Sequence, residues 1–408
     1  MVSFTLSPKR DLNLNNLRVA LFNFVVSRQR GEGFIIVVDD INLDSKNSKE
    51  AQNLDILKKF AIDTQKIVYR SKNLNIYQEF AYRLVKDKKA FVCFCQGSNC
   101  TNNCKELSNQ DLKSLKDSGK EFNIKVFKPL KEYSFNDVIF GDQKSNIEQI
   151  NEFTILNSDG TPTEIFASAI DAMVMGISLI IREEEFLKDS AKEIYIRELL
   201  DFTQKINYAH IPKILSKEEI LIKNLFIDGF IPDAIINYIF LLNLEPPKEL
   251  FYLPDVIEWF DITKVSNKRV EFDLERLKSL NKKHLQKMDS IKLSSIFGFR
   301  DSDIGELLKI LLKNATTINE LEEKFKPLFS KKECSSDMKK LSKIILEAPF
   351  IESYDNFINY LKQKTQFTEN ELIVSLKALL LGNKECNIEL KDIYPYIKSY
   401  LLEVAQCQ

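Results

Sequence analysis

The N-terminal stretch has a strand, a turn and a helix in an order that can bind phosphate. The apolar run Val2–Leu6 predicts a strand, and Ser7-Pro8 predicts a turn after it. A helix is predicted next, because apolar residues follow at the spacing of a buried helical face: Leu17, Ala20, Leu21 and Phe24. Free backbone N–H groups and the positive end of the helix dipole favour an anion at such a helix start. The stretch therefore predicts a phosphate-binding turn.

The turn lacks the glycine that lets a backbone approach a phosphate closely. It carries Lys9, Arg10, Asn13 and Asn15 instead, and the first glycine of the chain is Gly31. Lys9 and Arg10 could recruit a phosphate by charge. The alternative is that they are charged residues in an exposed turn and are only solvated.

Four of the seven cysteines lie close together in the sequence CFCQGSNCTNNC. Cys93, Cys95, Cys100 and Cys104 could supply four thiolates to a tetrahedral zinc ion. The spacing C-x-C-x4-C-x3-C is not a standard zinc spacing, so a surface loop with incidental thiols stays as the alternative. We expect no disulfides, because they are rare in cytoplasmic proteins.

The elements around these residues alternate between strands and helices. Residues 33–40 (GFIIVVDD) predict a central parallel strand whose carboxyl end faces a ligand crevice. Helices are predicted around residues 49–60 and 74–85, and the second leads into a strand-like run at residues 90–95. This alternation predicts an α/β fold with a parallel sheet. Residues 96–150 are less regular, with the short strand candidates FNIKVF and FNDVIF, and we interpret them as an insertion.

The α/β pattern resumes at Phe153 and ends near residue 215. It predicts a helix at residues 167–173, a strand at residues 177–181 with Arg182 at its end, and a helix at residues 190–200. Amphipathic helices follow to the C-terminus, the first of them at residues 223–227, 232–242, 254–260 and 274–288. The chain therefore combines an α/β half with an all-helical half.

Composition indicates a soluble, cytoplasmic protein of several domains. The 408 residues are 44% apolar and 29% charged, and no run approaches the roughly 18 apolar residues of a membrane span. The N-terminus also lacks the pattern of a signal peptide. A net charge of −1 gives no overall attraction to nucleic acid, so any RNA contact must come from a local basic patch.

One such patch lies at residues 267–287. Seven basic residues oppose three acidic ones there, and they include Lys268, Arg269, Lys278, Lys282 and Lys283. Leu274, Leu277 and Leu285 are left to pack inward. The patch could follow a phosphate backbone, and the alternative is a solvated helix face.

Several stretches, in order, resemble glutamyl-tRNA synthetase, a class I aminoacyl-tRNA synthetase. They are SPKRDLNLNNLRVALFN, VVDDIN, DGTPTEIFASAIDAMVMGISLIIREEEF and YAHIPKIL. The resemblance runs from about residue 3 to about residue 400. It implies a Rossmann-type catalytic domain with an acceptor-stem insertion, followed by all-α stem-contact and anticodon-binding domains. The implied boundaries are 1–95 and 151–215 for the two catalytic halves, 96–150 for the insertion, 216–295 for the stem-contact domain and 296–408 for the anticodon-binding domain.

The resemblance also implies ATP- and Mg²⁺-dependent attachment of glutamate to tRNA, but the catalytic positions are altered. Where the family's HIGH signature has a histidine against the ATP phosphates and a glycine under the adenine, this chain has Asn13 and Asn15. The family's KMSKS loop supplies a mobile lysine to the phosphates. Here the segment after Leu215 is shorter than in the family, and only Ser216-Lys217 corresponds to that loop.

The implied amino-acid pocket is altered in the same way. Positions that differ from the family's pattern are Ser3, Val37, Asp39, Glu164 and Ala172, and those that match it are Ser7, Asp171, Arg182 and His210. We assign substrate binding to Ser7, Asp39, Asp171 and Arg182. One arginine cannot easily replace the bidentate pairs that the two carboxylates of glutamate need. Arg182 could instead be ion-paired at its strand end, and His210 could be a packing histidine.

Three hypotheses follow from the sequence. The leading one is a degenerate paralogue, monomeric, that has lost glutamate activation and keeps tRNA binding through Lys268, Arg269, Lys278, Lys282 and Lys283. It would present tRNA to, or regulate, a partner such as a second synthetase or an amidotransferase. The second is a working ligase that uses Lys9, Arg10, Arg182 and Lys217 in altered roles with ATP and Mg²⁺. The third is a protein-interaction scaffold without an RNA role.

Overall fold

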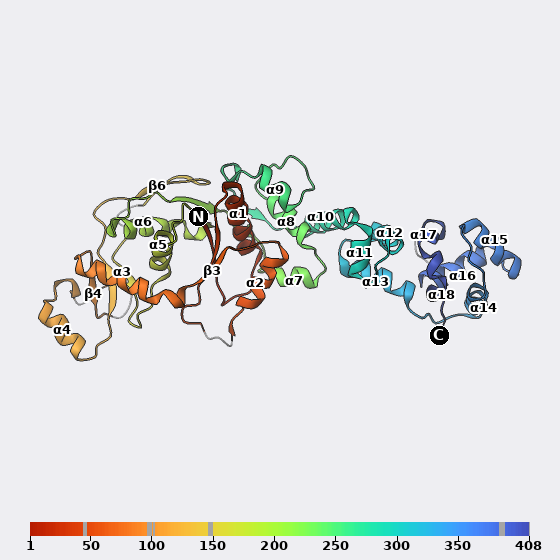
Figure 1. Ribbon diagram of the computed structural model, residues 1–408, viewed down its shortest axis with the longest axis horizontal. Coiled ribbons are helices and arrows are strands. Elements are labelled where there is room, and N and C mark those ends of the chain that lie inside the picture. The colour runs from red at the N-terminus through yellow and green to blue at the C-terminus, as the bar shows by residue number, and fades with distance from the viewer. Residues whose placement is uncertain (44–46, 96–99, 101–102, 146–149, 383–387, 408) are drawn as a thin grey trace. The chain divides into compact units, whose positions relative to one another are not determined.

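The chain folds into two compact units, which are described separately. The computed structural model describes residues 1–43, 47–95, 100, 103–145, 150–382 and 388–407 (Figure 1). The first unit comprises residues 1–224 and 239–272, and the second comprises residues 225–238 and 273–408. The five domain boundaries expected from the sequence are finer than this division and stay predictions.

The first unit is built on a seven-stranded sheet in the order β3-β2-β1-β9-β10-β6-β7. Its strands are β1 (Val2–Leu6), β2 (Phe34–Val38), β3 (Lys66–Tyr69), β6 (Ser134–Asp137), β7 (Gly141–Lys144), β9 (Leu179–Glu183) and β10 (Asn207–Ile211). All neighbouring pairs are parallel except β6 with β7. The predicted parallel α/β fold is confirmed. Strand β3 was not predicted from the sequence, and β9 begins two residues later than expected.

Helices connect these strands: α1 (Leu14–Arg30), α2 (Glu50–Lys59), α3 (Leu74–Lys86), α5 (Glu164–Val174) and α6 (Ser190–Leu199). Helix α1 follows β1 directly, as the apolar spacing predicts, and its residues from Leu17 to Ser27 are all buried. The amide of Asn23 donates to the backbone oxygen of Ile181 at 3.0 Å, which ties α1 to β9. Gly31 ends the helix with φ 61°, a left-handed conformation that favours glycine.

The strand predicted at residues 90–95 does not extend the parallel sheet. It forms β4 (Ala90–Cys93), which pairs antiparallel with β5 (Asn123–Val126) in a separate sheet that β8 (Phe153–Leu156) completes. All residues of β4 are buried, as are those of β2 in the main sheet, so hydrophobic pattern alone could not identify the partner of β4. The candidates FNIKVF and FNDVIF are confirmed as β5 and β6. The hairpin β6–β7 joins the main sheet at β10, and α4 (Asn109–Asp117) lies between β4 and β5 in the chain.

The remaining strands, β11 (Ile214–Leu215) and β12 (Val270–Glu271), form a small parallel pair in the first unit. Between these two strands the chain runs through α7 (Ile222–Ile227), α8 (Pro232–Leu241) and α9 (Leu253–Trp259). The second unit is all-helical where described, as predicted. Its helices are α10 (Leu274–Lys287), α11 (Ser290–Ile296), α12 (Ser302–Leu311), α13 (Ile318–Phe329), α14 (Ser336–Leu346), α15 (Tyr354–Lys364), α16 (Glu369–Leu381), α17 (Leu390–Ile397) and α18 (Leu401–Val404).

Two sequence-based expectations for the second unit are wrong. Leu274 does not pack inward; it is 41% exposed, because it is the first residue of α10 and precedes the turn that buries Leu277 and Leu285. Cys334 and Cys407 form a disulfide, although none was expected. Cellular compartment predicts how readily disulfides are reduced, but it cannot reveal that two cysteines 73 residues apart lie together.

Among the described residues, none of the helices combines the length and the apolar character needed to cross a bilayer.

The second unit should lose stability in mild acid through His284. The ring of this buried residue of α10 donates from Nε2 to Asn237 Oδ1 at 2.8 Å. Burial, followed by the charge of Lys287, lowers the pKa of His284 from 6.5 to about 4. The unfolded chain therefore takes up a proton below pH 6.5 that the folded chain does not, which costs about 2 kcal/mol of unfolding free energy between pH 7 and pH 5.

Urea denaturation of the wild type and of His284→Gln at both pH values measures this cost. The glutamine variant should show a shallower loss of stability, because it has no ring to protonate. Equal losses in the two proteins would contradict the prediction.

Candidate functional site

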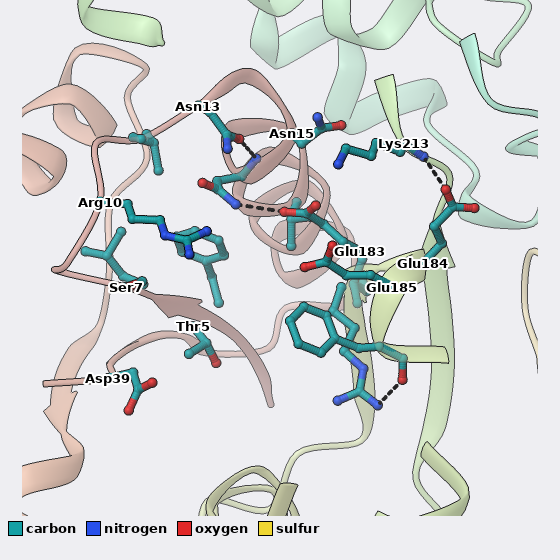
Figure 2. A pocket seen from close by; sticks show the side chains of 18 of the residues that line it. Thr5, Ser7, Arg10, Asn13, Asn15, Asp39, Glu183, Glu184, Glu185 and Lys213 are labelled. Carbon is teal, nitrogen blue, oxygen red and sulfur yellow. Dashed lines mark hydrogen bonds between the residues drawn. The ribbon is translucent and has the colours of Figure 1, made fainter. Parts of the chain in front are cut away.

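A cavity of about 1320 Å³ opens at the carboxyl ends of β1, β2 and β9. The strand order reverses between β1 and β9, and this reversal is where ligands bind in open α/β sheets. The cavity brings together most of the site residues predicted from the sequence: Ser3, Ser7, Lys9, Arg10, Asn13, Asn15, Val37, Asp39, Glu164, Asp171, Ala172, Arg182 and Lys217. Figure 2 shows Ser7, Arg10 and Asp39 on one side of it and Glu183, Glu184 and Glu185 on the other.

The first turn of α1 is satisfied by groups of the chain itself. Asn13 caps the helix, because its Oδ1 accepts a hydrogen bond from the backbone N–H of Asn16 at 2.8 Å. Its Nδ2 donates to Glu219 Oε1 at 2.7 Å, and the N–H of Leu14 donates to the backbone oxygen of Ile220 at 2.9 Å. A helix start binds anions through free N–H groups. At least two of those groups are already bonded within the protein.

Asn15 forms two hydrogen bonds with the backbone of β11. The N–H of Ile214 donates to Asn15 Oδ1 at 2.9 Å, and Asn15 Nδ2 donates to the oxygen of Ile214 at 3.3 Å. The side-chain amide of Asn15 therefore bonds to both the N–H and the C=O of Ile214. Any ligand placed between α1 and β11 must break both bonds.

The connection from β11 to α7 is short and bound to the chain that leads into α1. Residues 216–221 make this connection, and Leu221 forms an antiparallel bridge with Asn13. The N–H of Ile222 donates to the oxygen of Leu12 at 3.0 Å, and Lys223 pairs with Asp11 at 2.6 Å. We call residues 219–223 and 11–14 together the clamp. Lys217 lies just outside it, exposed and next to Glu218 and Glu219.

Arg70 is a central residue of the site that the sequence did not reveal. It is 2% exposed, its Nε lies 2.9 Å from Asp171 Oδ2, and its Nη1 lies 3.4 Å from Asp39 Oδ1. The hydroxyl of Tyr77 donates to Asp171 Oδ1 at 2.6 Å. Burial alone would lower the pKa of Arg70, but the charges of Asp171 and Asp39 raise it. Arg70 directly follows strand β3, and an arginine at the end of a parallel strand is a candidate ligand-binding residue. Because β3 was not predicted from the sequence, Arg70 was not identified.

The donors of Arg182 are likewise directed at protein atoms. Nη1 contacts Glu193 Oε1 at 2.5 Å, and Nη2 contacts Ser190 Oγ at 2.8 Å and the oxygen of Phe186 at 3.2 Å. Nε donates to His210 Nε2 at 3.1 Å. Four hydrogen bonds therefore hold the guanidinium in place, so a ligand at Arg182 would have to displace some of them.

His210 accepts a hydrogen bond from Arg182 and does not line the cavity. It is 0% exposed, and its Nδ1 lies 2.6 Å from Asp137 Oδ2. These contacts assign the proton to Nδ1, which leaves Nε2 to accept from Arg182. Burial lowers the pKa of His210, and the charge of Arg182 lowers it further against the opposing effect of Asp137. The ring is therefore neutral in the folded protein at neutral pH.

The charge of the cavity does not favour an anion. Its described lining has ten acidic and eight basic side chains. Neighbouring atoms crowd Glu164 even though it reaches solvent, and this desolvation raises the pKa of its carboxyl. Burial also raises the pKa of Glu183, and Glu185 adds to the effect. An anionic ligand in the cavity would lie beside these carboxylates, whose charge the neighbouring cations do not fully balance.

The five basic residues of the predicted patch fall in different units. Lys268 and Arg269 belong to the first unit, and Arg269 Nε contacts Glu184 Oε1 at 2.5 Å on the cavity rim. Lys278, Lys282 and Lys283 lie on α10 in the second unit. Lys278 pairs with Glu275 at 3.0 Å, and Lys282 donates to the backbone oxygen of Lys313 at 2.7 Å.

The four clustered cysteines converge in a geometry that could hold a metal ion. The sulfurs of Cys93, Cys95, Cys100 and Cys104 all lie within 4.8 Å of one another. Cys95 lies 3.7 Å from Cys104 and 4.0 Å from Cys100. Four thiolates at about 2.3 Å from a tetrahedral zinc ion are separated by about 3.8 Å. Burial raises the pKa of Cys93 to about 12 and also raises that of Cys104, an effect that a bound cation would reverse.

Comparisons with known proteins agree with this architecture. Residues 2–102 and 96–279 match the family described as tRNA synthetases class I (E and Q), catalytic domain. The chain is 40% identical to glutamate–tRNA ligase 2 of Sulfurovum sp. (strain NBC37-1), over 99% of this chain and 100% of the relative. It is 35% identical to glutamate–tRNA ligase 2 of Sulfurimonas denitrificans, over the whole of both.

Solved structures show the same fold. The glutamate–tRNA synthetase of Elizabethkingia anophelis superposes with a TM-score of 0.80 at 19% identity, covering 99% of this chain and 98% of that one. A glutamate–tRNA ligase of Elizabethkingia meningosepticum, solved with its amino acid, gives a TM-score of 0.81 at 19% identity with the same coverage.

Replacing Arg70 should destabilise the protein strongly. The Arg70→Met variant leaves two carboxylates, Asp39 and Asp171, without their cation, and removing one partner of a buried ion pair typically costs about 3–5 kcal/mol. The matched control is Arg83→Met on α3, where the half-exposed arginine pairs with Asp87 at 3.7 Å and should contribute less than about 0.5 kcal/mol. Urea denaturation at pH 7 compares the two.

The Arg70→Met/Asp171→Asn double variant provides a further check. It removes one of the uncompensated charges and should recover part of the lost stability. Equal costs for Arg70→Met and Arg83→Met would mean that the Arg70 cluster does not stabilise the site.

Proposed function

Because the chain belongs to the class I tRNA synthetase family for glutamate and glutamine, we propose that it binds tRNA and has lost ATP-dependent activation of glutamate. It presents tRNA to, or regulates, another component of translation, such as a second synthetase or an amidotransferase, and acts as a monomer. The observation that carries this proposal is the start of α1, which is closed by groups of the chain itself.

The hydrogen bonds at α1 oppose ATP binding. The resemblance to the family places the ATP phosphates at the position of Asn13 and the adenine over the position of Asn15. Asn13 caps the helix and bonds to Glu219, and Asn15 is paired with the backbone of Ile214. ATP would have to break these bonds. It would also place its roughly four negative charges beside the many carboxylates of the cavity lining. Ligand-binding pockets are usually largely formed before the ligand arrives.

The clamp also opposes the role of a mobile catalytic lysine. In the family that lysine reaches the phosphates on a flexible loop, but here the corresponding residues 216–221 directly precede α7 and run into the clamp. Glu218 and Glu219 directly follow Lys217 in the sequence, so the connection carries more negative than positive charge.

Arg182 and Arg70, the two cavity arginines on or next to strands of the main sheet, are both paired with carboxylates of the protein. Binding of the two carboxylates of glutamate requires arginines with unoccupied donors. Arg182 makes four hydrogen bonds to protein groups, and Arg70 faces Asp39 and Asp171. Glu164 also lines the cavity and would repel a negative substrate.

RNA binding depends on the basic residues of α10 and on Lys268 and Arg269. Lysines on one helix can follow a phosphate backbone even when each has a local protein contact, since such surface contacts are weak. The relatives are named glutamate–tRNA ligases, and this supports tRNA as the partner.

The same names favour a second candidate, a working glutamate–tRNA ligase. It would use the exposed Lys9, Arg10 and Lys217 at the cavity, together with Arg182, ATP and Mg²⁺. The two candidates differ in whether the protein forms glutamyl-adenylate.

We expect no tRNA-dependent ATP–pyrophosphate exchange with glutamate, and salt-sensitive binding of tRNA. Exchange is measured with concentrated full-length protein against a heat-killed sample, and binding at several salt concentrations. The Lys282→Glu/Lys283→Glu variant should lower the slope of log affinity against log salt by about 2, because two phosphate contacts are lost. The control, Lys339→Glu/Lys340→Glu on exposed positions of α14, should leave this slope unchanged.

Each alternative has its own outcome in this experiment. Exchange above the heat-killed sample would establish the working ligase. Absence of both exchange and tRNA binding would favour the scaffold. Unchanged tRNA affinity in the α10 variant would remove that helix from the RNA-binding surface.

We also propose that Cys93, Cys95, Cys100 and Cys104 hold a structural zinc ion, because their sulfurs have the separations of a tetrahedral thiolate site. Metal analysis of purified protein should find one zinc per chain. Cys104→Ser should lose it, whereas Cys407→Ser, outside the cluster, should retain it. Metal-free wild-type protein purified with added zinc would overturn the assignment.

A further inference from the structure

The C-terminal segment of the second unit, residues 401–407, is fastened by a disulfide and by backbone contacts. Cys407 is bonded to Cys334, which precedes α14. The N–H of Lys332 donates to the oxygen of Gln406 at 3.2 Å, and Lys332 forms a parallel bridge with Cys407. Ser342 Oγ donates to the oxygen of Ala405 at 2.7 Å. Val404 and Ala405 are both 0% exposed, so the segment completes the core of this unit.

Lys332 is a buried cation that depends on the same segment. Its Nζ donates to the oxygen of Leu328 at 2.6 Å, near the end of α13, and to the oxygen of Val404, the last residue of α18. The carbonyl ends of helices favour a cation. If α18 leaves, Lys332 loses one of these two acceptors, and the buried ammonium must then reach water. The segment is therefore either docked as a whole or released as a whole.

The disulfide can be reached from solvent on a basic surface. Cys334 and Cys407 are both half-buried. Cys407 lines a surface hollow of about 370 Å³ together with Lys339, Ser342, Lys343 and Glu347. Lys339 and Lys343 are exposed and lie one turn apart on α14. Two cations beside an accessible disulfide sulfur attract an anionic thiol and stabilise thiolates.

We propose that Cys334–Cys407 is an exchangeable latch, opened at Cys407 by an anionic low-molecular-weight thiol of the glutathione class. The latch controls docking of residues 401–407. This inference does not depend on the function proposed for the cavity, because it concerns the second unit alone.

The exchange proceeds in two balanced steps. A glutathione thiolate attacks Cys407 Sγ, the bond between the two protein sulfurs breaks, and Cys334 leaves as a thiolate that takes a proton from water. A second glutathione thiolate attacks the glutathione sulfur of the mixed disulfide. This releases oxidised glutathione and the thiolate of Cys407. Oxidised glutathione reverses both steps, so the latch follows the thiol–disulfide balance around it.

The test uses the oxidised full-length protein and measures both chemistry and docking. The protein is treated with reduced glutathione, quenched with iodoacetamide at several times, and mapped by peptide mass spectrometry. Hydrogen exchange of residues 401–407 is followed in parallel. We expect the mixed disulfide on Cys407, and loss of amide protection in this segment as the latch opens. Cys334→Ser should show the unprotected segment without any thiol.

A charge variant separates attraction of the thiol from simple access. Lys339→Gln/Lys343→Gln should slow opening by glutathione by about threefold to tenfold and leave opening by neutral 2-mercaptoethanol unchanged. The control Lys362→Gln/Lys364→Gln, on α15, should change neither rate.

Four results would overturn the proposal. The first is alkylation of both cysteines in oxidised protein before any thiol is added. The second is a mixed disulfide mainly on Cys334. The third is unchanged protection of residues 401–407 after reduction. The fourth is equal slowing of both thiols in the charge variant.

Discussion

The start of α1 is the point on which the rest of the site depends. A parallel sheet directs the N–H groups of its first helix toward the crevice, and in this chain those groups meet the chain's own polar atoms. Asn15 extends the closure by joining α1 to β11 through two hydrogen bonds. If the site does not bind ATP, as we propose, charge elsewhere in the cavity does not have to balance a polyphosphate. Glu183 at the end of β9 and Glu184 and Glu185 after it line the cavity. Their negative charges would oppose the binding of a nucleotide.

Arg70 and Arg182 have the same relation to the sheet. Arg70 follows β3 and holds Asp39, which follows β2, and Asp171 on α5. Arg182 lies in β9 and holds Glu193 on α6, with His210 of β10 behind it. Each arginine therefore connects adjacent elements through charge, and breaking either contact would leave an uncompensated charge in a buried place. These ion pairs connect the strands and helices that line the crevice.

The sequence predicted the repeating elements well because their periodicity is local. The strand–turn–helix at residues 2–30, the helices of the second unit and the cluster of cysteines all follow from spacing between near neighbours. What it missed depends on contacts between distant residues. Strand β3 is short and only partly buried, so Arg70 had no predicted strand to place it. The partner of β4, the bonds of Asn15 to Ile214 and the Cys334–Cys407 pair join segments whose proximity no local pattern encodes.

The clamp between residues 11–14 and 219–223 has a consequence for how this chain can change over time. Two of its hydrogen bonds join main-chain atoms, from Leu14 to Ile220 and from Ile222 to Leu12, so they need no side-chain donor or acceptor at those positions. Restoring an asparagine to histidine or glycine would alter the edges of the crevice and leave that backbone pairing in place. A longer loop in place of residues 216–221 would require inserted residues. The pairing at the start of α1 therefore depends more on the course of the backbone than on the side chains of Asn13 and Asn15.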